Sequence, residues 1–187
     1  GRRQALETVG RTTGPDFGRY KRTTILRRFH RRMDATGTAT VRDYAALLAR
    51  DPDETRRLAE DLTINVTSFF RDDAPFRVLE QTLIPELLAR RGAEGIRVWV
   101  PACSSGEEAY SLAILLSEVL GDHIDEFHVR IFATDVNGAA ISFARRGIYA
   151  PAAVADLSGA LLQRYFTPVD GGYEVKKVVR RLVVFGQ

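Results

Sequence analysis

Residues 99–116 read WVPACSSGEEAYSLAILL and run from an apolar, strand-like stretch through a turn of small residues into two glutamates and a helix. Turns of this kind commonly bind phosphate, because the helix N-terminus offers unpaired N–H groups and the positive end of its dipole. Glu107 and Glu108 stabilise a helix start but would repel a phosphate, and the Gly-x-Gly-x-x-Gly pattern of dinucleotide sites is absent. The turn therefore favours a cationic or neutral ligand.

A third acidic residue, Asp135, follows the next strand-like segment, HVRIFAT at 128–134. Ligands of open α/β sheets bind beyond the carboxyl ends of the strands, where both the turn and Asp135 are expected. An aspartate in this place is suited to accept hydrogen bonds from the two hydroxyls of a ribose. Such an acceptor, beside a turn that repels phosphate, fits S-adenosylmethionine, which has an adenosine, a positive sulfonium and an α-ammonium but no phosphate.

These residues also have structural alternatives. Ser105 to Glu108 fits a capping box, in which Glu108 bonds back to the N-cap amide, and Asp135 could serve as an ordinary cap for the helix after it. Cys103 is the single cysteine, which excludes an internal disulfide and a cysteine-built metal site. We interpret it as a buried filler rather than a nucleophile, because no histidine lies near it in sequence, and we predict no metal site.

Two textures divide the chain. Residues 1–64 predict an N-terminal helical domain with helices at 23–33, 41–50 and from 51 through 62, and residues 65–94 a linker and a connecting helix. From residue 96 the pattern alternates between strands (96–100, 128–134) and helices (107–120, 138–146), with an antiparallel hairpin at about 166–185. The fold class is therefore α/β with a partial parallel sheet. Only two parallel strands are recognisable, so we expect a fragment that ends at Gln187 before the second half of its sheet.

Composition indicates a globular chain of 187 residues, 45% hydrophobic, with no apolar run long enough to span a bilayer, and a cytoplasmic location is the default. Residues 1–33 carry ten basic side chains and two acidic ones. Arg27, Arg28, Arg31 and Arg32 fill the polar face of one predicted amphipathic helix, which either is solvated or meets an acidic partner. A helical DNA-binding protein would account for this face and for the pI near 9.2, but not for the acidic turn or Asp135.

Four blocks, LTINVTSFFRD, VWVPACSSGEEAYSLAI, IFATDVNGAAISFARRGIY and LLQRYFTPVDGGYEVKKVVRRLVVF, together resemble the CheR chemotaxis-receptor methyltransferases in order and spacing. The resemblance covers nearly the whole chain. It implies a Rossmann-like, class I methyltransferase sheet and transfer of a methyl group from S-adenosylmethionine to glutamates on the cytoplasmic helices of chemoreceptors, with S-adenosylhomocysteine as the product. It implies neither nucleic-acid binding nor membrane insertion, and it places a further segment of the family after Gln187. The alternative in this class is a methyltransferase-like signalling module that binds cofactor or a partner without turnover.

The resemblance also implies roles for individual residues. Cofactor contacts are expected from Asn65, Thr67, Arg71, Glu108 and Asp135, with Arg71 also near the reacting centre. Phe69 and Phe70, between these linker residues, are expected in the core. The cationic quartet Arg27, Arg28, Arg31 and Arg32 would dock the acidic receptor helices, and the hairpin corresponds to a subdomain that docks a receptor peptide in some members.

Overall fold

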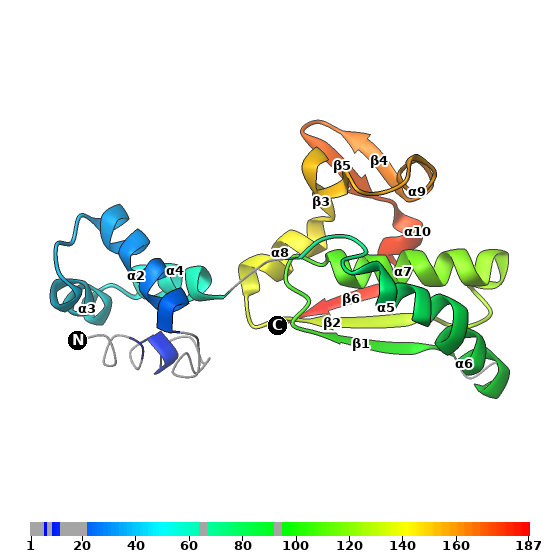
Figure 1. Cartoon of the computed structure of the whole chain (residues 1–187), viewed down its shortest axis with the longest axis horizontal. Helices are drawn as coiled ribbons and strands as arrows, with labels where there is room; N and C mark the ends of the chain where they lie inside the picture. The colour runs from blue at the N-terminus through cyan, green and yellow to red at the C-terminus, as the bar shows by residue number, and fades with distance from the viewer. Residues whose placement is uncertain (1–5, 7–8, 12–21, 64–66, 92–94) are drawn as a thin grey trace. The chain divides into compact units, whose positions relative to one another are not determined.

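The computed structural model describes residues 6, 9–11, 22–63, 67–91 and 95–187, and the chain divides into two compact units, residues 1–64 and 65–187 (Figure 1). Each unit has its own hydrophobic core. The two units are therefore treated one at a time.

The first unit is helical, with α2 (Arg22–Thr36), α3 (Val41–Arg50) and α4 (Pro52–Leu62), as the apolar spacing predicted. Thr40 caps α3 by accepting from the Asp43 N–H, and Asp51 caps α4 by accepting from the Asp53 and Glu54 N–H groups. The three helices bury one cluster of side chains at their centre: Ile25, Phe29, Met33, Tyr44, Leu48, Leu58, Ala59 and Leu62.

The second unit opens with a helical run of three parts, α5 (Asp73–Val78), the π-helical segment η2 (Leu79–Leu83) and α6 (Ile84–Arg91). Its central sheet contains β1 (Arg97–Pro101), β2 (Arg130–Thr134) and β6 (Val183–Gly186), in the order β1-β2-β6 with both pairings parallel. The connecting helices are α7 (Glu107–Leu120) and α8 (Gly138–Arg146). The expected α/β class with a parallel sheet is confirmed.

The last strand corrects one detail of the sequence interpretation. We expected two parallel strands and a hairpin that extends to about residue 185, whereas β6 is a third parallel strand, paired with β2 from Ile131↔Val183 to Thr134↔Gly186. The antiparallel sheet is smaller and has the order β3-β5-β4, from β3 (Ile148–Tyr149), β4 (Phe166–Val169) and β5 (Gly172–Val175). Helix α9 (Gly159–Tyr165) precedes β4, and the single turn α10 (Lys177–Arg180) leads from β5 into β6; short 3-10 turns lie at Gly121–His123 and Pro151–Val154.

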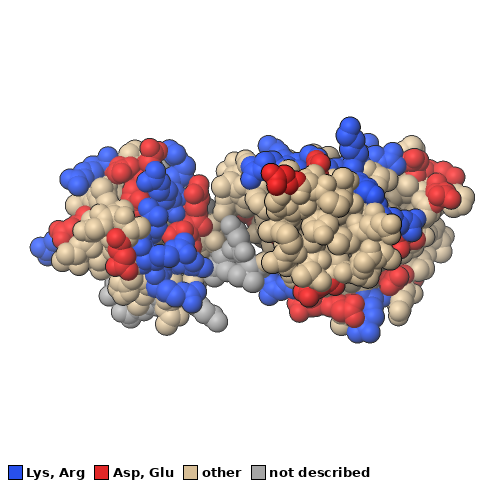
Figure 2. All heavy atoms as spheres, turned by 90° about the horizontal axis from the view of Figure 1, so that it is seen from above, with Lys and Arg blue, Asp and Glu red and all other residues tan. Residues whose placement is uncertain are grey.

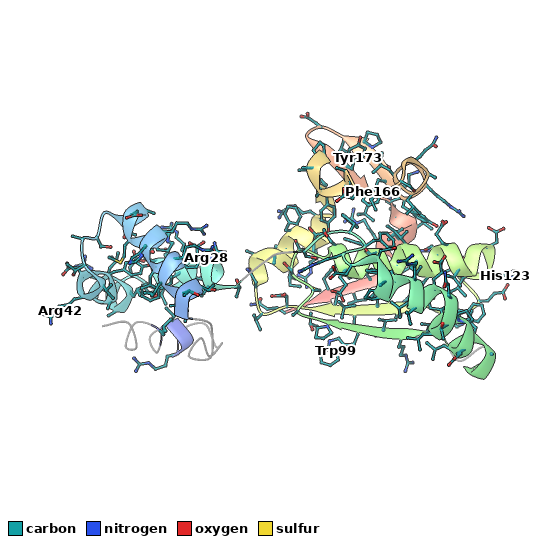
Figure 3. The ribbon with its side chains drawn as sticks, viewed as in Figure 1. Arg28, Arg42, Trp99, His123, Phe166 and Tyr173 are labelled. Carbon is teal, nitrogen blue, oxygen red and sulfur yellow. The ribbon has the colours of Figure 1, made fainter. Side chains whose placement is uncertain are left out.

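The parallel sheet buries one face under α7. Val100, Ile131 and Ala133 are buried on that face, whereas Trp99, Phe132 and Val184 are 68%, 42% and 49% exposed. These last three residues are register partners across the strands, and Trp99 points away from α7 (Figure 3). In the described part of the chain, no helix has the length and apolar character that crossing a bilayer requires.

Candidate functional site

The turn between β1 and α7 is built from alternating left-handed residues. Ala102, Ser104 and Gly106 have φ of 55°, 49° and 95°, a conformation that glycine adopts without strain and other residues rarely adopt. At Gly106 a side chain has no room, because a Cβ there would lie 2.8 Å from the Ala144 Cβ and 3.1 Å from the ring of Phe185. The turn is therefore pressed against α8 and β6, beyond the carboxyl end of β1.

Asp135 fastens this turn to the end of β2. One carboxylate oxygen accepts from the Ser104 N–H at 2.8 Å and the other accepts from the Asn137 N–H at 2.8 Å. The suggested role of Asp135 as the cap of the next helix is wrong, because Asn137 is the N-cap of α8 and accepts from the Ala140 N–H. A carboxylate offers about four acceptor positions, so half-buried Asp135 retains lone pairs for a ligand.

The two glutamates of the turn have different environments. Glu107 is 6% exposed and accepts from the Ser105 hydroxyl at 2.7 Å, and burial raises its pKa. Glu108 is exposed and has no hydrogen-bond or ion-pair partner among the residues the structure describes. The capping box is wrong as well, since the N-cap of α7 is Gly106, which has no side chain to bond with. Glu108 is thus the carboxylate at this helix start that a cationic ligand could reach.

The linker segment before α5 is held against the start of α7. The Phe70 N–H donates to the Ser111 hydroxyl at 2.9 Å, and that hydroxyl donates to the Glu107 carbonyl at 2.7 Å. Phe69 is buried as expected and packs edge-on against Tyr149 and Phe166, with ring centroids 4.9 and 5.3 Å apart. Both contacts anchor the backbone between the linker's candidate residues to the helix that carries Glu108.

Those linker residues differ in how much the structure says of them. Thr67 is half-buried, Arg71 is exposed, and Asn65 lies outside the described residues. The Arg71 Nε lies 3.9 Å from the nearest Asp72 carboxylate oxygen, and both side chains are largely exposed, so this ion pair contributes little stability. The backbone is left-handed on either side of Arg71, at Phe70 (φ 48°) and Asp72 (φ 58°). Thr67 and Arg71 thus flank the anchored residues.

Cys103 is 1% exposed, and burial, with the nearby Asp135 carboxylate, raises the pKa of its thiol to about 12. Since the thiolate is the nucleophile, a thiol of this kind is inert near neutral pH. Across the described ranges, no three His, Cys, Asp or Glu side chains are grouped as metal ligands would be.

The four arginines of α2 have unequal surroundings in the first unit. Arg32 donates from its Nε to Glu54 at 2.9 Å, and Glu54, which is 1% exposed, also accepts from the Tyr44 hydroxyl at 2.7 Å. Burial alone would raise the pKa of Glu54, but the hydrogen bonds from Arg32 and Tyr44 outweigh it and leave that pKa lowered. Arg32 therefore belongs to an internal network, which its place in the helical pattern did not reveal.

The other three members of the quartet remain nearer to the surface. Arg31 pairs with Asp61. Arg28 (labelled in Figure 3) is half-buried, and Arg27 is exposed with no partner among the described residues. Figure 2 shows basic and acidic side chains interspersed over the visible face of this unit. Arg27 is the member most available to a partner.

Comparisons with known protein families match both units. Residues 3–63 match the model described as "CheR methyltransferase, all-alpha domain", and residues 65–187 match "CheR methyltransferase, SAM binding domain". SAM denotes S-adenosylmethionine, so the second match covers the turn, Asp135 and the linker.

Individual relatives give the same result over most of the chain. Chemotaxis protein methyltransferase 1 of Pseudomonas aeruginosa is 33% identical over 94% of this chain and 66% of its own length. Chemotaxis protein methyltransferase 2 of Vibrio cholerae is 30% identical over 94% of this chain and 62% of its own. An uncharacterized 104.1 kDa protein of Rhodobacter capsulatus is 36% identical over 92% of this chain but only 18% of its own length. The chain thus spans less than two thirds of the length of each.

Proposed function

The chain belongs to the CheR methyltransferase family, and on that premise we propose that it serves the transfer of a methyl group from S-adenosylmethionine to glutamate side chains of chemoreceptors. The observation that carries the proposal is the pairing of two unlike carboxylates at one edge of the sheet. Glu108 is exposed and unpartnered among the described residues, and Asp135 is joined to the same turn through the Ser104 N–H.

The residues present fit this cofactor. The Glu108 carboxylate suits a cationic group, either the α-ammonium or the sulfonium, and the free lone pairs of Asp135 suit the two ribose hydroxyls. The turn itself is acidic where a phosphate site would be neutral or basic, which agrees with a cofactor that has no phosphate. Thr67, Arg71 and Asn65 would complete the site from the linker.

The chemistry asks little of the protein's own side chains. S-adenosylmethionine supplies the methyl group as an electrophile when bound. The acceptor is a glutamate, whose ordinary pKa near 4.3 makes it an anion at neutral pH, so no general base is needed. The chain's tasks are to orient the two reactants and to exclude water. We assign to Arg71, an exposed cation beside the anchored linker, the orientation of a carboxylate of the substrate or of the cofactor.

The substrate in this proposal is an acidic helical region of a chemoreceptor, which places the protein in the cytoplasm. Attraction between that region and the outer face of α2 would align the partners. Within the quartet, exposed Arg27 is the strongest candidate for a docking contact, followed by Arg28 and by Arg31, which would exchange its pairing with Asp61. Arg32 supports this face from inside through Glu54.

Calorimetric titration of S-adenosylhomocysteine into the chain tests the cofactor site. We expect saturable binding that Glu108→Gln weakens by about tenfold, because a hydrogen bond to a charged group contributes roughly 1.5–3 kcal/mol. Glu126→Gln is the matched control, since Glu126 is an exposed glutamate that precedes the amino end of β2. Equal binding by the native chain and the Glu108 variant, or no binding at all, would contradict the assignment.

Turnover needs a separate measurement. Labelled methyl groups should pass from S-adenosylmethionine to chemoreceptor fragments, and Arg71→Gln should slow the transfer more than it weakens binding of the homocysteine product. Binding without transfer would instead favour the non-catalytic signalling module.

A further inference from the structure

A second concave site lies away from the acidic turn, where α7, α8, α10 and β6 meet (Figure 1). Its volume is about 430 Å³, within the range of small-molecule sites. We name it the basic cavity, and its lining is Tyr110, Arg145, Lys177, Arg180, Arg181, Val183 and Phe185. Four of these seven residues are cationic, although the cofactor proposed above requires none of them.

The charges of the basic cavity are only partly compensated. Arg180 donates to Glu174 at 2.7 Å, and Arg181 donates to Asp125 at 2.6 Å. Within the described ranges, neither Arg145 nor Lys177 has a carboxylate partner. The cations therefore exceed their paired carboxylates by two, and a concave surface of one sign concentrates the field on what enters it.

Two of the guanidinium groups are held in place by backbone carbonyls. Arg145 donates from one Nη to the Phe185 carbonyl at 2.7 Å, and Arg180 donates from one Nη to the Arg145 carbonyl at 2.8 Å. A carbonyl positions a guanidinium without neutralising it, so its charge and remaining N–H donors stay available. Gly147 leaves the space for this arrangement, because a Cβ there would lie 3.5 Å from the Arg180 Nε. Binding an anion would consequently cost little further side-chain ordering.

The chemistry of these groups points to a phosphoryl oxyanion. Guanidinium forks match the oxygens of phosphate in pairs, and an ammonium adds a point charge. The apolar lining residues Tyr110, Val183 and Phe185 provide a surface for a group attached to the phosphate. We propose that the basic cavity binds the phosphoryl group of a small molecule, at a site separate from the methyl-donor site. The proposal does not depend on methyl transfer.

The experiment is a calorimetric titration of the 187-residue chain with inorganic phosphate, pyrophosphate and ADP, at an ionic strength held constant with sodium chloride. We expect saturable binding of at least one probe. Lys177→Gln and Arg145→Gln should each weaken it by about tenfold, through loss of a charge-assisted contact. Lys177 has no printed contact within the chain, so its variant should retain the native fold. Arg97→Gln is the matched control: Arg97 is exposed on β1, outside the cavity lining.

The outcomes separate the possibilities. Binding of ADP that is tighter than that of pyrophosphate would support a nucleoside-linked phosphate, and equal binding would support a free oxyanion. No saturable binding of any probe would overturn the proposal, and so would an equal loss in the Arg97 control. Titration of S-adenosylhomocysteine into the Lys177 variant should give native affinity, which keeps this test distinct from that of the proposed function.

Discussion

Replacement of Asp135 should weaken the second unit even before any ligand is considered. Its two carboxylate oxygens hold the Ser104 and Asn137 N–H groups at 2.8 Å each. A hydrogen bond to a charged group contributes roughly 1.5–3 kcal/mol, and half-burial favours the lower end because water can replace part of the interaction. Asp135→Ala should therefore cost about 3 kcal/mol of unfolding free energy, and Asp135→Asn about half as much, because the amide retains one acceptor oxygen.

Urea unfolding followed by tryptophan fluorescence measures this loss within the correct unit. Trp99 is the single tryptophan, lies in β1, and donates to the Thr134 hydroxyl at 3.1 Å, one residue before Asp135. Glu108→Gln serves as the control and should leave the unfolding midpoint unchanged, since Glu108 is exposed and has no printed contact with the described residues. Each variant is also titrated with S-adenosylhomocysteine.

An unfolding free energy for Asp135→Ala within about 0.5 kcal/mol of the native value would refute the bracing role, because surface changes without structural contacts fall in that range. Loss of cofactor binding in such a variant would then report a direct contact. If the variant is destabilised as expected, its loss of binding has two causes. For that reason the Glu108 variant is the sharper test of the cofactor site.

Three further changes test other parts of the structure. The lowered pKa of Glu54 means that its stabilising pair with Arg32 is fully present above the unfolded value near 4.5 and is lost as pH falls through the lower folded value. Hydrogen exchange in α2–α4 should therefore accelerate in acid, and Glu54→Ala should cost about 3–5 kcal/mol at neutral pH; protection unchanged by the variant would contradict this. Gly106→Ala should cost at least about 2 kcal/mol in the Trp99 unfolding assay, because its Cβ would meet Ala144 at 2.8 Å in a left-handed backbone, whereas a native midpoint would show that α8 yields. The Cys103 thiol, with a pKa of about 12, should resist iodoacetamide at pH 8 until urea unfolds the chain, and stoichiometric labelling of the native protein would disprove its burial.

Helix positions were the most predictable part of the fold because their signals are local. The predicted bounds 41–50, 107–120 and 138–146 coincide with α3, α7 and α8. For α8, the stop signal is Gly147, which adopts the left-handed C-cap conformation at φ 66°. Apolar spacing and a cap are read within a few residues of the helix itself, so distant contacts are not needed to place it.

Strand partners depend on residues far apart in sequence, and the prediction of β6 failed for this reason. Val183–Gly186 is a four-residue strand, and it follows the β4–β5 hairpin closely enough to be read as part of it. Its true partner is β2, in the register Ile131↔Val183. A short apolar run does not reveal which of two available edges it joins.

The acidic turn illustrates the same limit at the level of single side chains. The sequence indicates two adjacent carboxylates at a helix start and hence a site that rejects phosphate. It does not indicate that Glu107 turns inward to Ser105 while Glu108 stays exposed, because adjacent helical residues differ by about 100° in direction and the packed face is set by β6 and α8. Arg32 was misjudged for a related reason: its partner Glu54 lies on another helix, 22 residues away in sequence. The sign of the charge at each surface was therefore predictable, whereas the division between structural and available charges required the tertiary contacts.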